Sequence, residues 1–231
     1  KLDKWAGTIG AIREAAARAG YGVHVEVLDA SRFGVPQKRH RMFMWGAAGR
    51  TDHEVEAAVL GSLAESMTAQ TPSFSVFSTL GPAGTERNPA TATAAITFAR
   101  NPILRRSAYA GMLFNGAGRP VDPAEPAPTM AASAGGNRTH IVDEGHVFGG
   151  NEPFVEAYLA DLQAGAEPRS GKAPSRLRRL TLAESMAFQT FPEGFRFEGS
   201  RSSIYRQVGN AVPCRLAKAA ARAARALITS I

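Results

Sequence analysis

The stretch YRQVGNAVP, residues 205–213, joins a polar segment to the start of the last predicted helix. Gly209 permits a sharp backbone turn, and Asn210 can cap the helix that follows. A helix start also offers free N–H groups to an acidic or polar ligand, so the stretch is a candidate ligand-binding turn. An ordinary capped helix has the same pattern, and taken alone the stretch leaves both interpretations open.

A second stretch, GVPQKRHRMF at residues 34–43, carries alternating polar side chains. In an extended segment the side chains of Gln37, Arg39 and Arg41 project to one side. Two guanidinium groups and an amide on one face form a site for a phosphate or for a carbonyl-bearing ring. A solvated basic edge strand that discourages aggregation has the same pattern.

Apolar periodicity predicts most of the regular elements. It indicates an amphipathic helix over 4–19, strands over 22–28 and 42–46, and helices over 53–66, 153–164 and 213–228. The second strand is a continuous apolar run, which is typical of a strand covered on both faces. Thr181 and Glu184 fit a capping box that opens a further helix. Between about 71 and 150 Gly, Pro, Ser, Thr and Asn separate short segments, which predicts loops and irregular strands.

Composition limits the possible functions. The 231 residues include 27 Lys and Arg against 20 Asp and Glu, and the net charge of +7 favours nucleic acid as the partner. A single cysteine, Cys214, excludes a disulfide framework and a cysteine-rich zinc site, and the five histidines are scattered. No apolar run approaches the roughly eighteen residues of a membrane span, and no signal peptide is evident. We expect no membrane segment, no metal and a cytoplasmic location.

Together the two stretches resemble the cytosine-5 DNA methyltransferase family. The family's Gln-x-Arg-x-Arg motif stands at GVPQ, as in residues 34–41 here. Its final motif, Y-R-Q-x-G-N-A-V-P, is matched in full at 205–213. Residues 118–137 look like the recognition segment whose Thr-Leu pair approaches DNA, with Met130 in place of Leu. The motif R-x-L-T-x-x-E-x-x-x-x-Q-x-F-P is matched by Arg179, Leu180, Thr181, Glu184, Gln189, Phe191 and Pro192.

The sequence also departs from the family's motifs. The family often has Pro and Arg where this chain has Leu182 and Ala183, and another Arg where it has Ala187. Those positions orient the recognition domain in the family, so docking on DNA would differ in detail.

The resemblance implies an α/β fold. It would be the C-terminal part of a Rossmann-like S-adenosylmethionine-dependent methyltransferase, with an inserted, loop-rich target-recognition domain of mixed β structure. Residues 1–50 would give the last strands and helix of the catalytic domain, and 51–175 the target-recognition domain. Residues 176–231 would return to the catalytic domain and pack against 1–47.

Some of the family's motifs are absent from this chain. It has no Pro-Cys-Gln nucleophile loop, no Glu-Asn-Val motif and no cofactor-binding strand and loop. We therefore expect a subunit or C-terminal fragment that is inactive alone and needs a second polypeptide or an N-terminal segment with those motifs. S-adenosylmethionine would be bound mainly by that missing half. Cys214 lies inside the final motif as a helix residue, and we assign it no catalytic role.

The resemblance also implies roles for single residues. Arg41 would hydrogen-bond O2 of a cytosine flipped out of double-stranded DNA, Arg39 would support the nucleophile loop, and Gln37 would hold the local geometry. Asn210 and Ala211 would line the cofactor pocket. The predicted DNA-binding residues are Thr129, Met130, Ser133, Gly135, Gly136, Arg176, Arg178 and Arg179, with the three arginines touching phosphates.

Two other functions share these features. One is a non-catalytic DNA-binding or specificity module of the same fold, and the other is an RNA cytosine methyltransferase relative. The intact arginine pair argues against a pure binder, and the long middle region with Thr129 and Met130 favours duplex DNA. The expected setting is a bacterial restriction-modification system, with the protein associated with the nucleoid.

Overall fold

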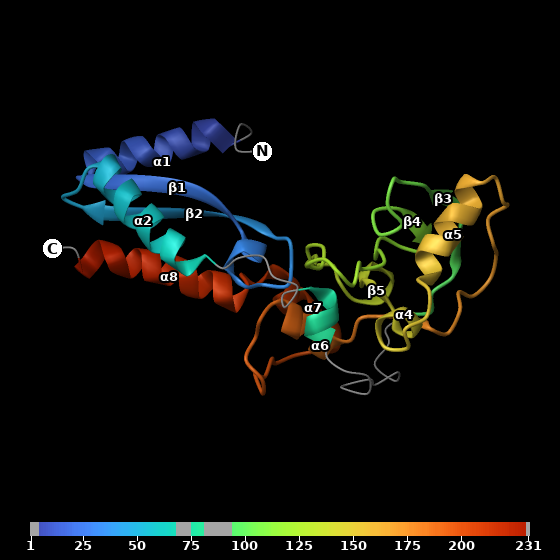
Figure 1. Cartoon of the computed structure of the whole chain (residues 1–231). Coiled ribbons are helices and arrows are strands. Elements are labelled where there is room, and N and C mark those ends of the chain that lie inside the picture. Colours follow the sequence, from blue (N-terminus) through green and yellow to red (C-terminus); the bar gives the residue numbers. More distant parts are fainter. Residues whose placement is uncertain (1–4, 68–74, 81–93, 230–231) are drawn as a thin grey trace. The chain divides into compact units, whose positions relative to one another are not determined.

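The computed structural model describes residues 5–67, 75–80 and 94–229. The predicted segments also include the remaining residues, and those parts of the predictions lie outside the described residues. The chain divides into two compact units (Figure 1). Unit 1 comprises residues 1–34, 39–70 and 214–231, and unit 2 comprises residues 35–38 and 71–213.

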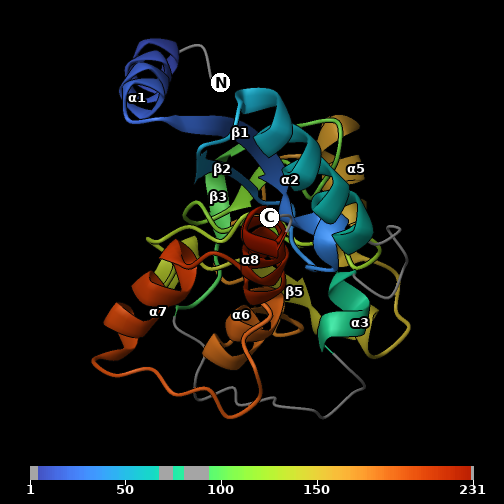
Figure 2. The same ribbon diagram turned by 90° about the vertical axis from the view of Figure 1, so that its left-hand side faces the viewer.

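Unit 1 is built on one antiparallel hairpin. The strands β1 (Tyr21–Asp29) and β2 (His40–Ala48) pair along their whole length, and the 3-10 helix η2 (Ala30–Phe33) follows β1. Three helices complete the unit: α1 (Ala6–Arg18), α2 (Asp52–Ser66) and α8 (Cys214–Thr229). Helix α2 packs against β1 and α8, and the hairpin lies between α1 and α8 (Figures 1 and 2). The predicted helices and strands of this part of the chain are confirmed within one or two residues.

Trp45 of β2 is the centre of the unit 1 core. Its side chain is buried, and its indole Nε1 donates to the carbonyl of Ala220 in α8 at 3.0 Å. The other face of the hairpin leaves large side chains exposed, among them Tyr21, Val27 and Met42. The prediction that the second strand is covered on both faces is therefore wrong for the described residues. The helices pack against this apolar run only on the face of the hairpin that carries Trp45. Around Trp45, α2 and α8 bury Val55, Val59, Leu63, Leu216, Ala219, Ala220, Ala223 and Leu227.

Unit 2 is rich in loops, as the sequence predicts. Its two small sheets each hold two antiparallel strands, β3 (Phe98–Ile103) with β4 (Met112–Phe114) and β5 (Ile141–Asp143) with β6 (Leu177–Arg179). Its helices are α3 (Val76–Leu80), η5 (Gly136–Arg138), α4 (Glu144–Val147), α5 (Phe154–Gln163), α6 (Leu182–Phe188) and α7 (Arg201–Asn210). One apolar cluster surrounds Tyr158 of α5, and a second surrounds Phe188 of α6. The predicted capping box opens α6, because Thr181 Oγ1 accepts from the Glu184 N–H at 3.1 Å.

The structure divides the chain differently from the predicted segments 1–50, 51–175 and 176–231. Helix α2 belongs to unit 1, because its apolar face packs against β1 and α8. Residues 176–213 belong to unit 2, because β6 pairs with β5 and α6 packs against α3. Of the predicted segment 176–231, only the residues from Cys214 onward belong to unit 1 with the N-terminal hairpin.

Gly209 has a different role from the predicted turn. It lies inside α7 and is buried, and Asn210 is the last residue of that helix. Asn210 therefore does not cap α8, which begins at Cys214. Gly209 is required because a Cβ at this position would collide with the carbonyl oxygen of Ala131 and lie 2.7 Å from the Cα of Ala132. The glycine lets α7 approach the backbone of residues 131–132 directly.

Substituting Gly209 with alanine tests this close approach. We expect Gly209→Ala to lower the free energy of unfolding by about 1–3 kcal/mol, because a methyl group is forced against backbone atoms. Gly61→Ala in α2 is the matched control, because no atom lies within 4 Å of the added Cβ. That change should stabilise the protein by about 0.5–1 kcal/mol through the helix propensity of alanine. Urea unfolding followed by circular dichroism measures both, and equal effects would contradict the packing described here.

Candidate functional site

The predicted Gln-x-Arg-x-Arg segment leads into β2. Gly34, after η2, adopts a left-handed backbone with φ of 73°, the chain bends at Pro36, and Gln37 forms an isolated bridge before β2 begins at His40. Gln37 and Arg39 have no exposed surface, while Lys38 and His40 are exposed. This alternation of burial agrees with the predicted projection of every second side chain to one side.

Gln37 and its neighbours hold the predicted DNA-binding segment. The Gln37 carboxamide accepts from the Met130 N–H at 3.1 Å and donates to the Phe188 carbonyl at 3.4 Å. Residues 36–38 form a parallel β-bridge with Ala127. The Lys38 N–H donates to the Ala127 carbonyl, and the Ala127 N–H donates to the Pro36 carbonyl. Thr129 Oγ1 also donates to the Lys38 carbonyl at 2.6 Å. The structure thus brings Gln37, Thr129 and Met130 together in unit 2.

Arg41 is close enough to Arg39 for its charge to affect the pKa of Arg39. Burial, followed by the charge of Arg41, lowers the pKa of Arg39 to about 10. Burial also lowers the pKa of Arg41, which is half-buried and donates from Nη1 to the His40 carbonyl at 2.7 Å. Arg39 is still protonated at neutral pH, since its pKa remains well above 7, and an arginine guanidinium keeps its charge in proteins. The segment therefore presents two cationic donors in a partly desolvated place.

The loop after Met130 is exposed and shaped by glycines. We call residues 133–139 the recognition turn. Gly135 and Gly136 have φ values of 113° and 59°, and the Gly135 N–H donates to Thr139 Oγ1 at 2.9 Å. Thr129 and Ser133 are exposed, as a DNA contact requires. Met130 is 3% exposed and packs in the Phe188 cluster, and its predicted place near the DNA stays a prediction.

The three predicted phosphate-binding arginines make contacts within unit 2. Arg176 bonds Asp143 at 2.6 Å, and Arg178 bonds Glu144 and Glu184 at 2.7 Å. Burial alone lowers the pKa of Arg178, but the hydrogen bonds and charges of Glu184 and Glu144 raise it overall. Arg179 is completely buried and donates to backbone and side-chain oxygens of two loops. Each of the three guanidinium groups therefore has acceptors within unit 2, and their contact with phosphates stays a prediction.

Two exposed cations beside the recognition turn were missed by the sequence analysis. Arg119 is exposed, and Arg138 is exposed with its Nη1 on Ser133 Oγ at 3.0 Å. Both lie in segments that resemble the family's recognition region, which is the one signal that the sequence offers for them. Nothing in the sequence distinguishes these exposed arginines from Arg176, Arg178 and Arg179, which bond to other parts of unit 2.

The predicted cofactor residues lie at the end of α7. The side chain of Asn210 is exposed, and Ala211 follows it with extended backbone. Cys214, the first residue of α8, is half-buried, and burial raises the pKa of its thiol. A thiol with a raised pKa is a weak nucleophile at neutral pH, which agrees with its assignment as non-catalytic.

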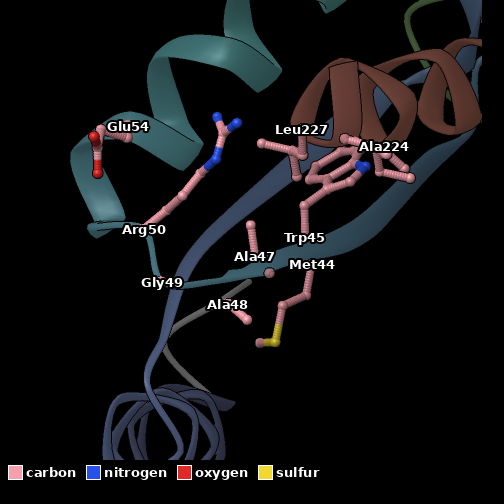
Figure 3. A pocket seen from close by; sticks show the side chains of 11 residues that line it. Met44, Trp45, Ala47, Ala48, Gly49, Arg50, Glu54, Ala224 and Leu227 are labelled. Atoms are coloured by element: carbon pink, nitrogen blue, oxygen red, sulfur yellow. The ribbon is translucent and has the colours of Figure 1, made fainter. Parts of the chain in front are cut away.

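Unit 1 contains a hollow of about 860 Å³ beside Trp45 (Figure 3). The end of β2, residues 44–48, and Ala224 and Leu227 of α8 line it. Figure 3 shows Trp45 directed at Leu227 and Ala224, with Arg50 and Glu54 extending from the start of α2. The hollow is lined by the C-terminal part of β2, whereas Arg41 lies near the start of that strand.

Residues 5–67, 75–80 and 94–229 hold no group of three or more His, Cys, Asp or Glu that could bind a metal ion. Within the same ranges, no helix has the length and apolar character needed to cross a membrane.

Known proteins resemble the chain over most of its length. It is 26% identical to the type II methyltransferase M.SacI of Streptomyces achromogenes, over 89% of this chain and 52% of that protein. It is 28% identical to the type II methyltransferase M1.HphI of Haemophilus parahaemolyticus, over 92% of this chain and 50% of that protein. The chain therefore spans about half the length of these relatives.

The fold and the family also match. The crystal structure of the S. pombe Dnmt2 methyltransferase superimposes with a TM-score of 0.59 at 14% identity, over 94% of this chain and 60% of that one. The family model of C-5 cytosine-specific DNA methylases matches residues 6–225. Since this match covers nearly the whole sequence, the chain belongs to the C-5 cytosine-specific DNA methylase family.

Proposed function

We propose that this protein is the target-recognising part of a DNA (cytosine-5)-methyltransferase, and that it completes the site for methyl transfer from S-adenosylmethionine to C5 of a flipped cytosine. One observation carries the proposal. The hydrogen bonds of Gln37 and Lys38 join the chain immediately before Arg39 and Arg41 to the recognition segment at Ala127–Met130. A pure DNA-binding module has no use for a buried Arg39 and a half-buried Arg41 directly after the segment that holds its recognition residues.

Arg41 would act on the cytosine ring. C5 and C6 are stacked inside a duplex, so the base must leave the stack before chemistry. Attack of a nucleophile at C6 moves electron density toward O2 and N3 of the ring. The half-buried guanidinium of Arg41 would donate a hydrogen bond to O2, and the interaction would strengthen as charge develops. Arg39, buried beside it, would contribute a second positive charge to the same field.

The nucleophile would come from another segment. The chain has one cysteine, and burial raises the pKa of the Cys214 thiol. We infer that a second polypeptide or an N-terminal segment supplies the Pro-Cys-Gln loop, the Glu-Asn-Val motif and the cofactor loop of a Rossmann-like domain. The apolar surfaces of unit 1 support this inference. Trp5 and Ile12 near or in α1 and Met42 of β2 are about half exposed, and the hollow beside Trp45 is open to receive further apolar side chains.

The residues at the end of α7 fit the edge of a cofactor site. The exposed carboxamide of Asn210 can both donate and accept hydrogen bonds, and the small side chain of Ala211 leaves room beside it. When bound, S-adenosylmethionine supplies the methyl group from its sulfonium. Enclosure of its adenosine requires more walls than these two residues provide, so we assign its main binding site to the other segment.

DNA would lie against the exposed residues of the recognition turn. Thr129 and Ser133 would face the target base pair, and Arg119 and Arg138 would contact phosphates. The net charge of +7 would support association with the duplex, with an affinity that falls as salt rises. Such a protein would work in the cytoplasm, beside the nucleoid.

Arg41→Ala separates chemistry from DNA binding. With the complementing segment present, we expect methyl transfer at saturating DNA to fall by about 100-fold or more, because a donor to developing charge is lost. DNA affinity should change by less than about threefold, because phosphate contacts elsewhere carry it. Tritiated methyl incorporation and fluorescence anisotropy measure the two. Arg222→Ala on the exposed face of α8 removes the same charge as a control. Equal losses of transfer and binding would make Arg41 a DNA anchor and favour the non-catalytic module.

Complementation tests the dependence on a second segment. Purified alone, the chain should transfer no methyl groups, because it has no thiol placed for attack at C6. Adding a polypeptide with the three missing motifs should restore transfer of tritiated methyl groups to DNA. Cys214→Ser should leave the restored rate nearly unchanged. Methylation by the lone chain, or loss of activity in Cys214→Ser with an unchanged circular dichroism spectrum, would show that the nucleophile has been misplaced.

A further inference from the structure

The β3–β4 hairpin of unit 2 exposes two large apolar side chains at its tip. Ile103, the last residue of β3, is 46% exposed, and Leu104 after it is 40% exposed. Among the large apolar residues that the described part of the chain exposes, these two are the one adjacent pair. Arg105 and Arg106 follow, and both are exposed. We call residues 103–106 the hairpin tip.

The backbone of the hairpin directs the tip. Between the pairs Phe98–Phe114 and Ile103–Met112, four residues of β3 stand opposite a single residue of β4, so β3 bulges. A bulge bends its strand and changes the direction of the residues that follow it. A Cβ at Gly111 would lie 2.9 Å from the Ile103 carbonyl oxygen, so glycine lets the two strands approach closely beside the tip.

Helix α5 anchors the hairpin (Figure 1). The Phe98 ring lies edge-on to the ring of Tyr158 in α5, with the centroids 5.0 Å apart, inside the apolar cluster around Tyr158. Just beyond the tip, Tyr109 Oη donates to Glu156 Oε1 of α5 at 2.8 Å. The exposed apolar pair therefore stands on a packed support and is not the consequence of a loose loop.

The hairpin tip lies in a cationic part of the chain. Residues 98–121 contain four arginines and no Asp or Glu. Arg100 lies in the bulge and is exposed, as Arg105 and Arg106 are. Within residues 5–67, 75–80 and 94–229, no carboxylate forms an ion pair with any of these three. A polyanion complements such a group of charges, and DNA is the polyanion of the proposed function.

Phosphate binding alone does not explain the apolar pair. Arginines bind phosphates without apolar neighbours, and two exposed branched side chains leave apolar surface in contact with water. Many proteins of the minor groove combine arginines with apolar side chains, Leu and Ile among them, that enter between base pairs and kink the duplex. The hairpin tip has both parts of such a device within four consecutive residues.

We propose that the hairpin tip is an apolar wedge that enters the duplex beside the target site and unstacks a base step there. Arg105 and Arg106 would bind the adjacent phosphates. The inference rests on the proposed function, because it takes DNA as the ligand. Shortly after β4, the Gly118 N–H donates to the Asn137 carbonyl of the recognition turn at 3.0 Å, so tip and turn belong to one unit. Opening a neighbouring step would make it easier to take the target cytosine out of the stack.

Unstacking is measured with the chain, its complementing segment and a duplex made of A and T alone. Such a duplex holds no cytosine to flip, and its TA steps unstack readily. 2-Aminopurine in place of adenine becomes brighter when it is unstacked. At saturating protein, the wild type should raise this fluorescence about threefold or more. Ile103→Ala/Leu104→Ala should lose most of the rise.

Leu60→Ala is the matched control, because Leu60 is 41% exposed and lies in α2 of unit 1. It should give the wild-type fluorescence. No rise with the wild type, or the same rise with the double variant as with Leu60→Ala, would overturn the proposal.

Salt titrations separate the two parts of the hairpin tip. By fluorescence anisotropy on the same duplex, Ile103→Ala/Leu104→Ala should lower DNA affinity about tenfold with an unchanged dependence on salt, because only apolar contact is lost. Arg105→Ala should reduce the slope of log K against log salt concentration by about one, because one phosphate contact is lost. A double variant that keeps its DNA affinity but changes its oligomeric state in light scattering would make the tip a protein contact and overturn the proposal.

Methyl transfer relates the wedge to base flipping. In the preferred site, found by bisulfite sequencing of a methylated random library, Ile103→Ala/Leu104→Ala should lower kcat about tenfold. A mismatch opposite the target cytosine should restore most of this loss, because an unpaired base leaves the stack more easily. A loss that the mismatch does not relieve would contradict the role in flipping. If the wild-type enzyme makes no 5-methylcytosine, the proposed function fails, and the A and T duplex still decides whether the tip unstacks DNA.

Discussion

Both ends of the Gln37 carboxamide bond to backbone that lies far away in the sequence, to Met130 N–H and to the Phe188 carbonyl, and the side chain has no exposed surface. The carboxamide offers the acceptor and the donor that these two partners need. Leucine would leave a buried donor and acceptor unpaired, at about 1–3 kcal/mol for each group, and glutamate cannot donate to the carbonyl. The parallel pairing of residues 36–38 with Ala127 depends on this contact, and Thr129 and the recognition turn follow from it along the chain.

Neighbouring carboxylates and burial affect the arginines of this protein in different ways. Arg178 lies between two glutamates, which raise its pKa overall, and it serves as a compensated structural cation. Burial lowers the pKa of Arg39 and Arg179 to about 10. Both guanidinium groups remain charged at neutral pH, although they lie where water solvates them poorly. An electrostatic effect on a reacting ring or on a loop is largest in such a place, because little water screens it.

The sequence predicted the local structure better than the assembly of its parts. Periodicity located α1, β1, α2 and α8, and the capping box located the start of α6, because these signals are carried by neighbouring residues. The pattern of α2 could not show which sheet it covers, so the helix was assigned to the recognition domain. Gly209 was interpreted as a turn, since a close approach to residues 131–132 leaves no trace in nearby sequence. The burial of Met130 and Arg179 was not predicted for the same reason, because burial depends on distant segments. The family motifs found the Gln37–Arg41 segment, but its hydrogen bonds to Thr129 and Met130 join residues about ninety positions apart, which no local pattern predicts.

The Gln37–Arg41 segment connects the two units through the covalent chain. Val35–Lys38 belong to unit 2 and are fixed by bonds to residues 127–130. Arg39 belongs to unit 1, where its N–H donates to Asp29 Oδ1 and its carbonyl accepts from the Ala30 N–H. Arg41 stands two residues further along, opposite Leu28 in β1. Two residues of extended chain span about 7 Å. The Gln37 side chain is therefore bonded within unit 2 and the Arg39 backbone within unit 1, although the two residues are only two positions apart in the sequence.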